Sequence, residues 1–381
     1  MQKSILSTLM VCLSLLSFDA EAHEIKRVIS FGDSYTDVSN GGPGSLDYPS
    51  KYQTIDSFKA AAYYPLPYAL LEALGPAGTD NMLGYGTSAA SINKFGGRVQ
   101  FASQVNSAIL IKFAKNDLVL VNIGINDADV LCNRAIDKQK CEKSGIEAAD
   151  AAAVQVKKLI DNGAKTIIFA AFSSTHHVHH WFGENAPQGD AFAAAYFDEL
   201  KKSLAPLTSS GAVIHLVDIA QFYDRVRLNP ELYGFDYYDQ PCAPKTPPCT
   251  LAEGGASWNK IEYKFGADQD WRVKHVLANL LHPSTGGLNV LAKYMADLVN
   301  YPDKVPPADI LIGNAGSLNQ SLEVKGTVIF HQEKDGAFEK LSGTGTLVKT
   351  GPGALTIKHG DFFKGPRQRL EGKLSVLVDR V

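Results

Sequence analysis

The chain has 381 residues, and its 37 Lys and Arg residues against 40 Asp and Glu residues give a formal net charge of -3. This length allows two or three domains or one large α/β unit. Hydrophobic residues make up 45% of the chain and charged residues 20%, which is ordinary for a globular protein. No basic stripe is present and the net charge is slightly negative, so the composition excludes no class except a typical nucleic-acid binder.

The first 22 residues have the pattern of a secretory signal peptide. Lys3 supplies a positive charge, an apolar run covers 5–18, and Ala20-Glu21-Ala22 is a small-residue cleavage site. The apolar run is shorter than the roughly 20 residues that a membrane-spanning helix needs. We therefore expect cleavage after Ala22 and export to the periplasm, the cell surface or the medium.

Four cysteines remain after this cleavage, because Cys12 lies inside the signal peptide. They form two close pairs, Cys132 with Cys141 and Cys242 with Cys249. Four cysteines allow three pairings, and proximity in the chain favours these two disulfides. Neither pair has the tight spacing that is usual for zinc ligands.

A tight turn follows the first predicted strand, which covers 27–31. The apolar run stops at Gly32-Asp33-Ser34, so a serine hydroxyl stands at the carboxyl end of a buried strand. Ligands bind outside this edge in open α/β sheets. Taken alone, Ser34 fits two roles equally well, as a cap of the next helix or as a nucleophile.

Helix and strand patterns then alternate along the chain. This alternation predicts an α/β fold with a parallel sheet covered by helices on both faces. Three special turns, at Ser34, Gly86 and Asn126, follow apolar segments, so one edge of the sheet can bring them together. Helices are predicted at 65–74, 99–113, 147–160 and 191–204 and from within 281–286 to 295, and further buried strands at 117–123, 165–171 and 212–217.

The pattern changes beyond Pro302. Range 303–312 contains Val305-Pro306-Pro307 and is predicted to be a linker. After it, short alternating runs with glycine turns and no helix predict an all-β segment. The expected organisation is a signal peptide at 1–22, a main domain at 23–302, the linker at 303–312 and a β-rich segment at 313–381.

Four of these separated positions supply most of what ester hydrolysis by a serine requires. A serine nucleophile needs a base, a group that orients the base, and donors for the oxyanion. Ser34, His282, Gly86 and Asn126 supply this inventory, except for the orienting group.

The motifs around these residues resemble those of the SGNH, or GDSL-type, lipase/esterase family over about residues 26–300. Phe31 to Asp37 matches the first block of the family, and 81–86 resembles the second. Gly124-Ile125-Asn126-Asp127 matches the third block and His282-Pro283-Ser284 resembles the fourth.

The resemblance implies a three-layer α/β/α sandwich with a flavodoxin-like parallel sheet. It also implies that Ser34 is the nucleophile and His282 the base. The oxyanion donors would be the Ser34 N–H, the Gly86 N–H and the Asn126 side chain. No metal or organic cofactor is required by this mechanism.

The chain departs from the family pattern at two places. Asn279 stands where the family usually has the Asp that orients the histidine, and Tyr85-Gly86 replaces two adjacent glycines. In a serine-protease triad, a change of Asp to Asn costs about 10⁴ in turnover. Asn279 acting weakly, together with a backbone carbonyl, is favoured over a carboxylate relocated to Asp268 or Asp270.

Four histidines cluster at His176, His177, His179 and His180. Such tracts hint at metal binding by composition only, and no acidic or cysteine partner is evident nearby. We interpret the cluster as a polar loop beside the substrate cleft and expect no metal.

The stretch 343–357 is similar to the autotransporter-associated β-strand repeat, which stacks as a β-solenoid. One or two copies are visible, and such repeats need neighbours to bury their faces. The alternative is an ordinary small β-module packed on the main domain.

The resemblance is closest to secreted bacterial lysophospholipases and glycerophospholipid–cholesterol acyltransferases. It implies an exported serine hydrolase of lipid or lysophospholipid esters, with a lipid substrate, contact with a membrane surface, possible acyl transfer and no nucleic-acid partner. The alternatives are a glycan or short-chain acetylesterase, and a catalytically silent surface or adhesion protein on the same scaffold.

Overall fold

The computed structural model describes residues 25–38, 65–75, 82–87, 89–133, 137–178, 182–236, 274–277, 281–300, 304–305 and 309–378. The expected signal peptide and its cleavage site at Ala22 lie outside these ranges, as do Cys242, Cys249, Asn279 and the alternative carboxylates Asp268 and Asp270. No helix within the described ranges is long and apolar enough to span a bilayer.

A parallel sheet forms the centre of the main domain, as predicted. Its strands carry near-continuous apolar runs, and both of their faces are buried. Neighbouring strands pair in parallel in the order β5-β4-β3-β1-β2. The strands are β1 (Arg27–Gly32), β2 (Met82–Gly84), β3 (Asp117–Asn122), β4 (Thr166–Ala171) and β5 (Val213–Asp218).

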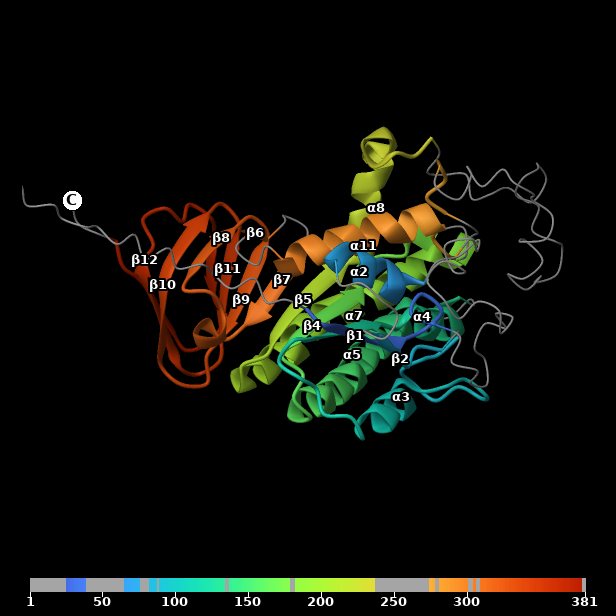
Figure 1. Cartoon of the computed structure of the whole chain (residues 1–381), viewed down its shortest axis with the longest axis horizontal. Coiled ribbons are helices and arrows are strands. Elements are labelled where there is room, and N and C mark those ends of the chain that lie inside the picture. The colour runs from blue at the N-terminus through green and yellow to red at the C-terminus, as the bar shows by residue number, and fades with distance from the viewer. Residues whose placement is uncertain are drawn as a thin grey trace, which may run out of the picture.

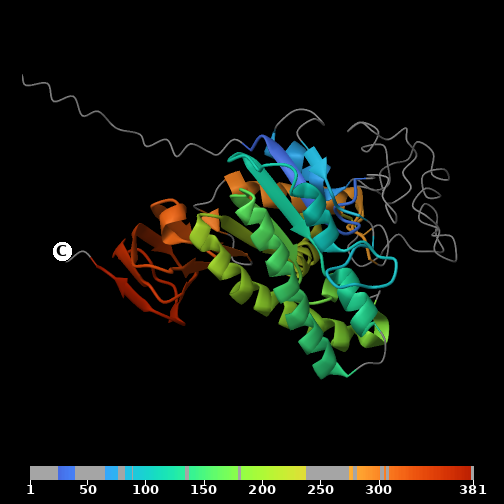
Figure 2. The same cartoon turned by 90° about the horizontal axis from the view of Figure 1, so that it is seen from below.

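Helices cover both faces of this sheet, so the predicted three-layer sandwich is confirmed (Figures 1 and 2). One layer packs its buried residues against one face: α3 (Phe101–Ala108), α4 (Ile125–Cys132), α5 (Lys138–Asp161) and α7 (Ala186–Leu204). The opposite layer contains α2 (Leu66–Leu74), α8 (Ile219–Leu228) and α11 (Thr285–Asn300). Figure 2 shows the long helices α5 and α7 side by side across the sheet.

The first cysteine pair connects two helices of one layer. Cys132 is the last residue of α4, and Cys141 lies in the first turns of α5. Their Cα atoms are 5.8 Å apart and the disulfide is present, which confirms this predicted pair. Helix α5 begins nine residues before the predicted start at 147, because Asp137 caps it by accepting a hydrogen bond from the Gln139 N–H.

The C-terminal segment winds as a parallel two-sheet β-solenoid (Figure 1). Successive strands alternate between the sheets, and each pairs with the next strand but one. Leu322 lies opposite Leu341, and Val328 opposite Leu347, so one coil takes 19 residues in each sheet. The strands are β6 (Lys304–Val305), β7 (Ile310–Gly313), β8 (Ser321–Val324), β9 (Thr327–His331), β10 (Gly336–Gly343), β11 (Thr346–Thr350), β12 (Ala354–His359), β13 (Arg367–Arg369) and β14 (Lys373–Val376).

The range expected to be a linker contains strands β6 and β7. Strand β7 pairs antiparallel with β5, with His215 opposite Leu311, so one solenoid sheet continues the sheet of the main domain. The prolines at 306 and 307 favour a linker by composition, but the apolar run Ile310–Gly313 finds an open sheet edge and pairs with it. The stacked coils bury a common apolar core, as repeats must.

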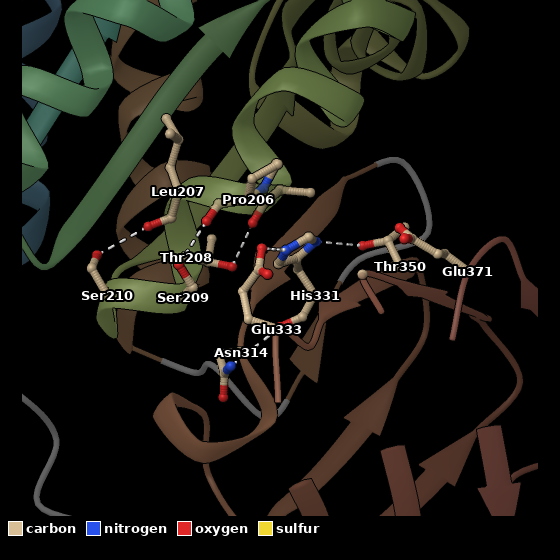
Figure 3. A network of polar contacts seen from close by, with 12 residues as sticks. Pro206, Leu207, Thr208, Ser209, Ser210, Asn314, His331, Glu333, Thr350 and Glu371 are labelled. Carbon is tan, nitrogen blue, oxygen red and sulfur yellow. Dashed lines mark hydrogen bonds and ion pairs between the residues drawn. The ribbon is translucent and has the colours of Figure 1, made fainter. Parts of the chain in front are cut away.

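A polar network joins successive coils close to the short helix η4 (Ala205–Ser210) (Figure 3). His331 Nδ1 lies 3.0 Å from the Thr350 hydroxyl, and His331 Nε2 lies 2.6 Å from Glu333 Oε1. Thr350 is the register partner of His331 one coil further on. The buried Lys349 donates to the carbonyl oxygens of Thr350 and Gly351. These bonds hold adjacent coils together and serve the stacking of the solenoid.

Candidate active site

Ser34 stands on the turn that ends β1. Gly32 has a φ of +131°, and a Cβ atom there would lie 1.8 Å from the Asn122 carbonyl oxygen, so only glycine fits. The Asp33 N–H donates to the same oxygen at 3.1 Å, and the Thr36 N–H donates to the Asp33 carbonyl at 3.0 Å. The turn therefore projects Ser34 from the carboxyl edge of the sheet.

His282 lies on a short loop that leads into α11. Leu277 and Pro283 form an antiparallel bridge, and the Ser284 N–H donates to the Val276 carbonyl at 2.8 Å. The loop brings His282 Nε2 to 2.7 Å from Ser34 Oγ, across 248 residues of chain. Burial lowers the pKa of His282 to about 3, so its imidazole is neutral near pH 7 and suited to accept a proton.

Tyr35 connects the serine turn with the histidine loop. Its hydroxyl donates to the Leu281 carbonyl at 2.6 Å, and its ring centroid lies 5.7 Å from that of His282. The neighbour of Ser34 in the chain is thus bonded to the neighbour of His282. The motif comparison did not reveal this contact, because a hydroxyl that binds a distant backbone carbonyl leaves no local pattern.

Gly86 lies beside the serine turn. It forms a parallel bridge with Asp37, and the adjacent Thr87 N–H donates to the Gly32 carbonyl at 2.9 Å. A Cβ atom at position 86 would lie 2.4 Å from the Thr36 carbonyl oxygen. The close approach of the two backbones explains the glycine, and it brings the 86–87 turn against the turn that carries Ser34.

Asn126 is the second residue of α4, at the carboxyl end of β3. Gly124, with a φ of +117°, allows the sharp entry into this helix. Asn126 Nδ2 donates to the Ala90 carbonyl at 2.9 Å, which orients the side-chain amide. An amide nitrogen carries two hydrogens, so this bond engages one donor and leaves the amide a second.

The comparison with known families agrees with this arrangement. A family model described as GDSL-like Lipase/Acylhydrolase matches residues 28–295. The chain belongs to this family. Membership in the GDSL family implies an ester hydrolase.

Solved structures share the GDSL fold at low sequence identity. A G-D-S-L family protein from Veillonella parvula is 12% identical, with a TM-score of 0.36, over 71% of this chain and 96% of its own. The carbohydrate acetylesterase Est24 from Sinorhizobium meliloti is 16% identical, with a TM-score of 0.35, over 72% and 98%. Phospholipase A1 from Streptomyces albidoflavus is 19% identical, with a TM-score of 0.32, over 52% and 82%. No curated protein matches the chain.

Two buried carboxyl groups support the turns of this GDSL site. Asp127 accepts the backbone N–H groups of Ile92 and Asn93, each at 2.9 Å, and so holds the loop whose Ala90 carbonyl orients Asn126. Burial raises the pKa of Asp127 to about 6. Burial, with the nearby charges of Asp127 and Asp37, raises the pKa of Asp33 to about 8. Asp33 is therefore neutral at pH 7 and unsuited to orient an imidazolium.

The histidine cluster is only partly described. His177 is buried between the rings of Phe172 and Tyr223, and burial lowers its pKa to about 3. His176 is largely exposed and lies 3.8 Å from Asp190. Within the described ranges, which omit His179 and His180, no group of three or more metal-ligating side chains comes together.

We predict that activity persists at acid pH. The neutral imidazole is the form that takes the serine proton, so activity falls as the pH drops through the pKa of His282. Because burial lowers that pKa from 6.5 to about 3, kcat/KM should stay level from neutral pH to about pH 5. The measurement is kcat/KM for a short p-nitrophenyl ester against pH, with circular dichroism at each pH. An acid limb near pH 6.5 in folded protein would contradict the prediction.

Proposed function

We propose that this GDSL-family protein is an exported serine hydrolase of lipid or lysophospholipid acyl esters. The observation that carries the proposal is the 2.7 Å hydrogen bond between Ser34 Oγ and His282 Nε2. Such a contact lets a neutral imidazole take the hydroxyl proton as the oxygen attacks.

The reaction proceeds through an acyl-enzyme. Ser34 Oγ bonds to the acyl carbonyl carbon while His282 Nε2 takes its proton, and the carbonyl oxygen becomes an oxyanion. The Ser34 N–H, the Gly86 N–H and the Asn126 amide stabilise this charge. The imidazolium then protonates the leaving alcohol as the ester C–O bond breaks. Water repeats the sequence and releases the fatty acid, and an alcohol in place of water gives acyl transfer.

A fluorophosphonate probe tests the nucleophile directly. It should form a covalent adduct that peptide mass spectrometry maps to Ser34. Labelling at another serine, or none in folded protein, would reject the mechanism and favour a silent surface or adhesion protein on this scaffold.

The lipid substrate is inferred from the family, whose description includes lipases and acylhydrolases. Hydrolysis rates on p-nitrophenyl esters of increasing chain length, and then on lysophosphatidylcholine, should rise with acyl length. The alternative, a glycan or short-chain acetylesterase, predicts a maximum at acetate. Binding to lysophosphatidylcholine-containing vesicles tests the proposed contact with a membrane surface.

Asn279→Asp is predicted to raise kcat or leave it unchanged. An Asp at this position stabilises the imidazolium that forms in the transition state, which an Asn amide cannot do. The same charge raises the pKa of His282, so the acid limb of kcat/KM should move to higher pH. Steady-state kinetics across pH measure both effects. A sharp loss of kcat in folded protein would show that Asn279 has another task.

Export is proposed from the N-terminal pattern, and the Cys132–Cys141 disulfide supports an oxidising compartment. N-terminal sequencing of the protein recovered outside the cytoplasm should begin at His23. Recovery of the intact N-terminus in the cytoplasm would reject this part of the proposal.

A further inference from the structure

We propose that Gln104, on helix α3, is a positioning residue for the Ser34 nucleophile. The inference rests on the proposed function, because it concerns how that serine is held. Gln104 is 72 residues from Gly32 in the chain, and it lies outside every motif that identifies the family.

The side-chain amide of Gln104 binds both backbone groups of Gly32. The Gly32 N–H donates to Gln104 Oε1 at 2.8 Å, and Gln104 Nε2 donates to the Gly32 carbonyl at 2.8 Å. The primary amide thus pairs with a backbone residue as a neighbouring strand would.

This pairing continues the sheet where a strand is missing. Strand β2 ends at Gly84, opposite Ser30, and the Tyr85 N–H donates to the Ser30 carbonyl at 2.8 Å. Beyond that point, the groups that pair with Gly32 on this side are the Thr87 N–H, at 2.9 Å, and the Gln104 amide. The carbonyl of Gly32 therefore links β1, the turn after Gly86 and helix α3.

The burial of Gln104 argues that the amide has a task. Its exposed fraction is 4%, and it shares the inner face of α3 with the fully buried Phe101, Val105 and Ala108. An apolar side chain would normally occupy such a position, since burying an amide is unfavourable unless both its groups are bonded. Here both groups are bonded, and both bonds go to Gly32.

Gly32 is separated from Ser34 by Asp33 alone. A shift of Gly32 moves Ser34 Oγ away from His282 Nε2, and it also releases the Thr87 N–H beside Gly86. A displacement of about 1 Å at a reacting group can lower a rate about 10²-fold. Loss of the amide should therefore lower kcat while leaving KM, which depends on the rest of the pocket, nearly unchanged.

Gln104→Glu provides a test that protonation can reverse. A neutral carboxylic acid has one O–H donor and one carbonyl acceptor, so it can reproduce both bonds to Gly32, whereas a carboxylate has no donor. We expect kcat at pH 8 to fall about tenfold or more, and the ratio of variant to wild-type kcat to rise as the pH falls through the pKa of the introduced acid.

Gln104→Met keeps the size of the side chain and removes both bonds. Its kcat should be low at every pH, and it carries the test if Gln104→Glu fails to fold. Asn106→Asp, an amide-to-acid change at an exposed position of the same helix, is the matched control and should behave as wild type. All rates are divided by the fraction of sites that a fluorophosphonate titrates, and thermal unfolding is recorded for each variant.

The outcomes separate the two proposals. Folded variants with wild-type kcat per titrated site, or a Glu-to-wild-type ratio that does not change with pH, would show that Gln104 serves stability alone. Wild-type protein that neither hydrolyses esters nor reacts with the probe would instead reject the proposed function, and this inference with it. A kcat loss at constant KM, restored by acid in Gln104→Glu only, supports the positioning role.

Discussion

Ser34→Ala is expected to lower ester hydrolysis roughly 10⁴- to 10⁶-fold and to abolish labelling by a fluorophosphonate. The substitution removes the oxygen that attacks the carbonyl, and His282 has no other hydroxyl acceptor of this kind 2.7 Å from Nε2 within the described ranges. Steady-state hydrolysis of a short p-nitrophenyl ester and gel-based labelling measure the two effects.

The fold should survive this change, because Ser34 is a small side chain that projects from a turn held by backbone bonds. The thermal unfolding midpoint is therefore expected to stay close to that of wild type. Ser107→Ala, at an exposed position on α3, is a matched control and should keep full activity. Residual hydrolysis above about 1% of wild type would mean that another group provides the nucleophile.

Asn126→Ala is expected to lower kcat by about 10²- to 10³-fold with a much smaller change in KM. An oxyanion donor acts mainly in the transition state, so its loss changes kcat more than substrate binding. Steady-state kinetics on a short ester measure the split between the two constants.

The same substitution also removes the hydrogen bond to the Ala90 carbonyl, so a stability loss of about 1 kcal/mol is expected. Urea unfolding measures this loss, and titrated active sites correct kcat for it. Asn106→Ala, at an exposed position, is the control for removing an amide. A variant that loses stability but keeps kcat per active site would show that Asn126 only supports the Ala89–Asn93 loop.

Much of the central sheet could be predicted because its strands are apolar on both faces. The predicted runs at 117–123 and 165–171 coincide with β3 and β4 to within a residue at each end. Helices α4 and α8 were not predicted. Both begin directly after the sheet edge, and the cap of α8 is Asp218, the last residue of β5, so strand and helix signals overlap there.

The C-terminal segment shows the same division. Alternating runs and glycines were sufficient to predict β-structure, but each run is too short to reveal its partner. The solenoid coil is defined by pairs 19 residues apart, such as Phe338 with Ile357. Strand β10 was not predicted, and the junction through β7 depends on an edge of β5 that forms only in the folded main domain.

By itself, the sequence determined the chemical inventory of this protein: a serine after a buried strand, glycine and asparagine turns, and a histidine before the last helix of the main domain. These are local features, because strand endings and turn glycines depend on neighbouring residues. Only the tertiary structure decided which groups meet, such as Ser34 with His282 and Gly32 with Gln104. Those contacts span 248 and 72 residues, and they arise from how the strands order within the sheet, which short-range patterns do not encode.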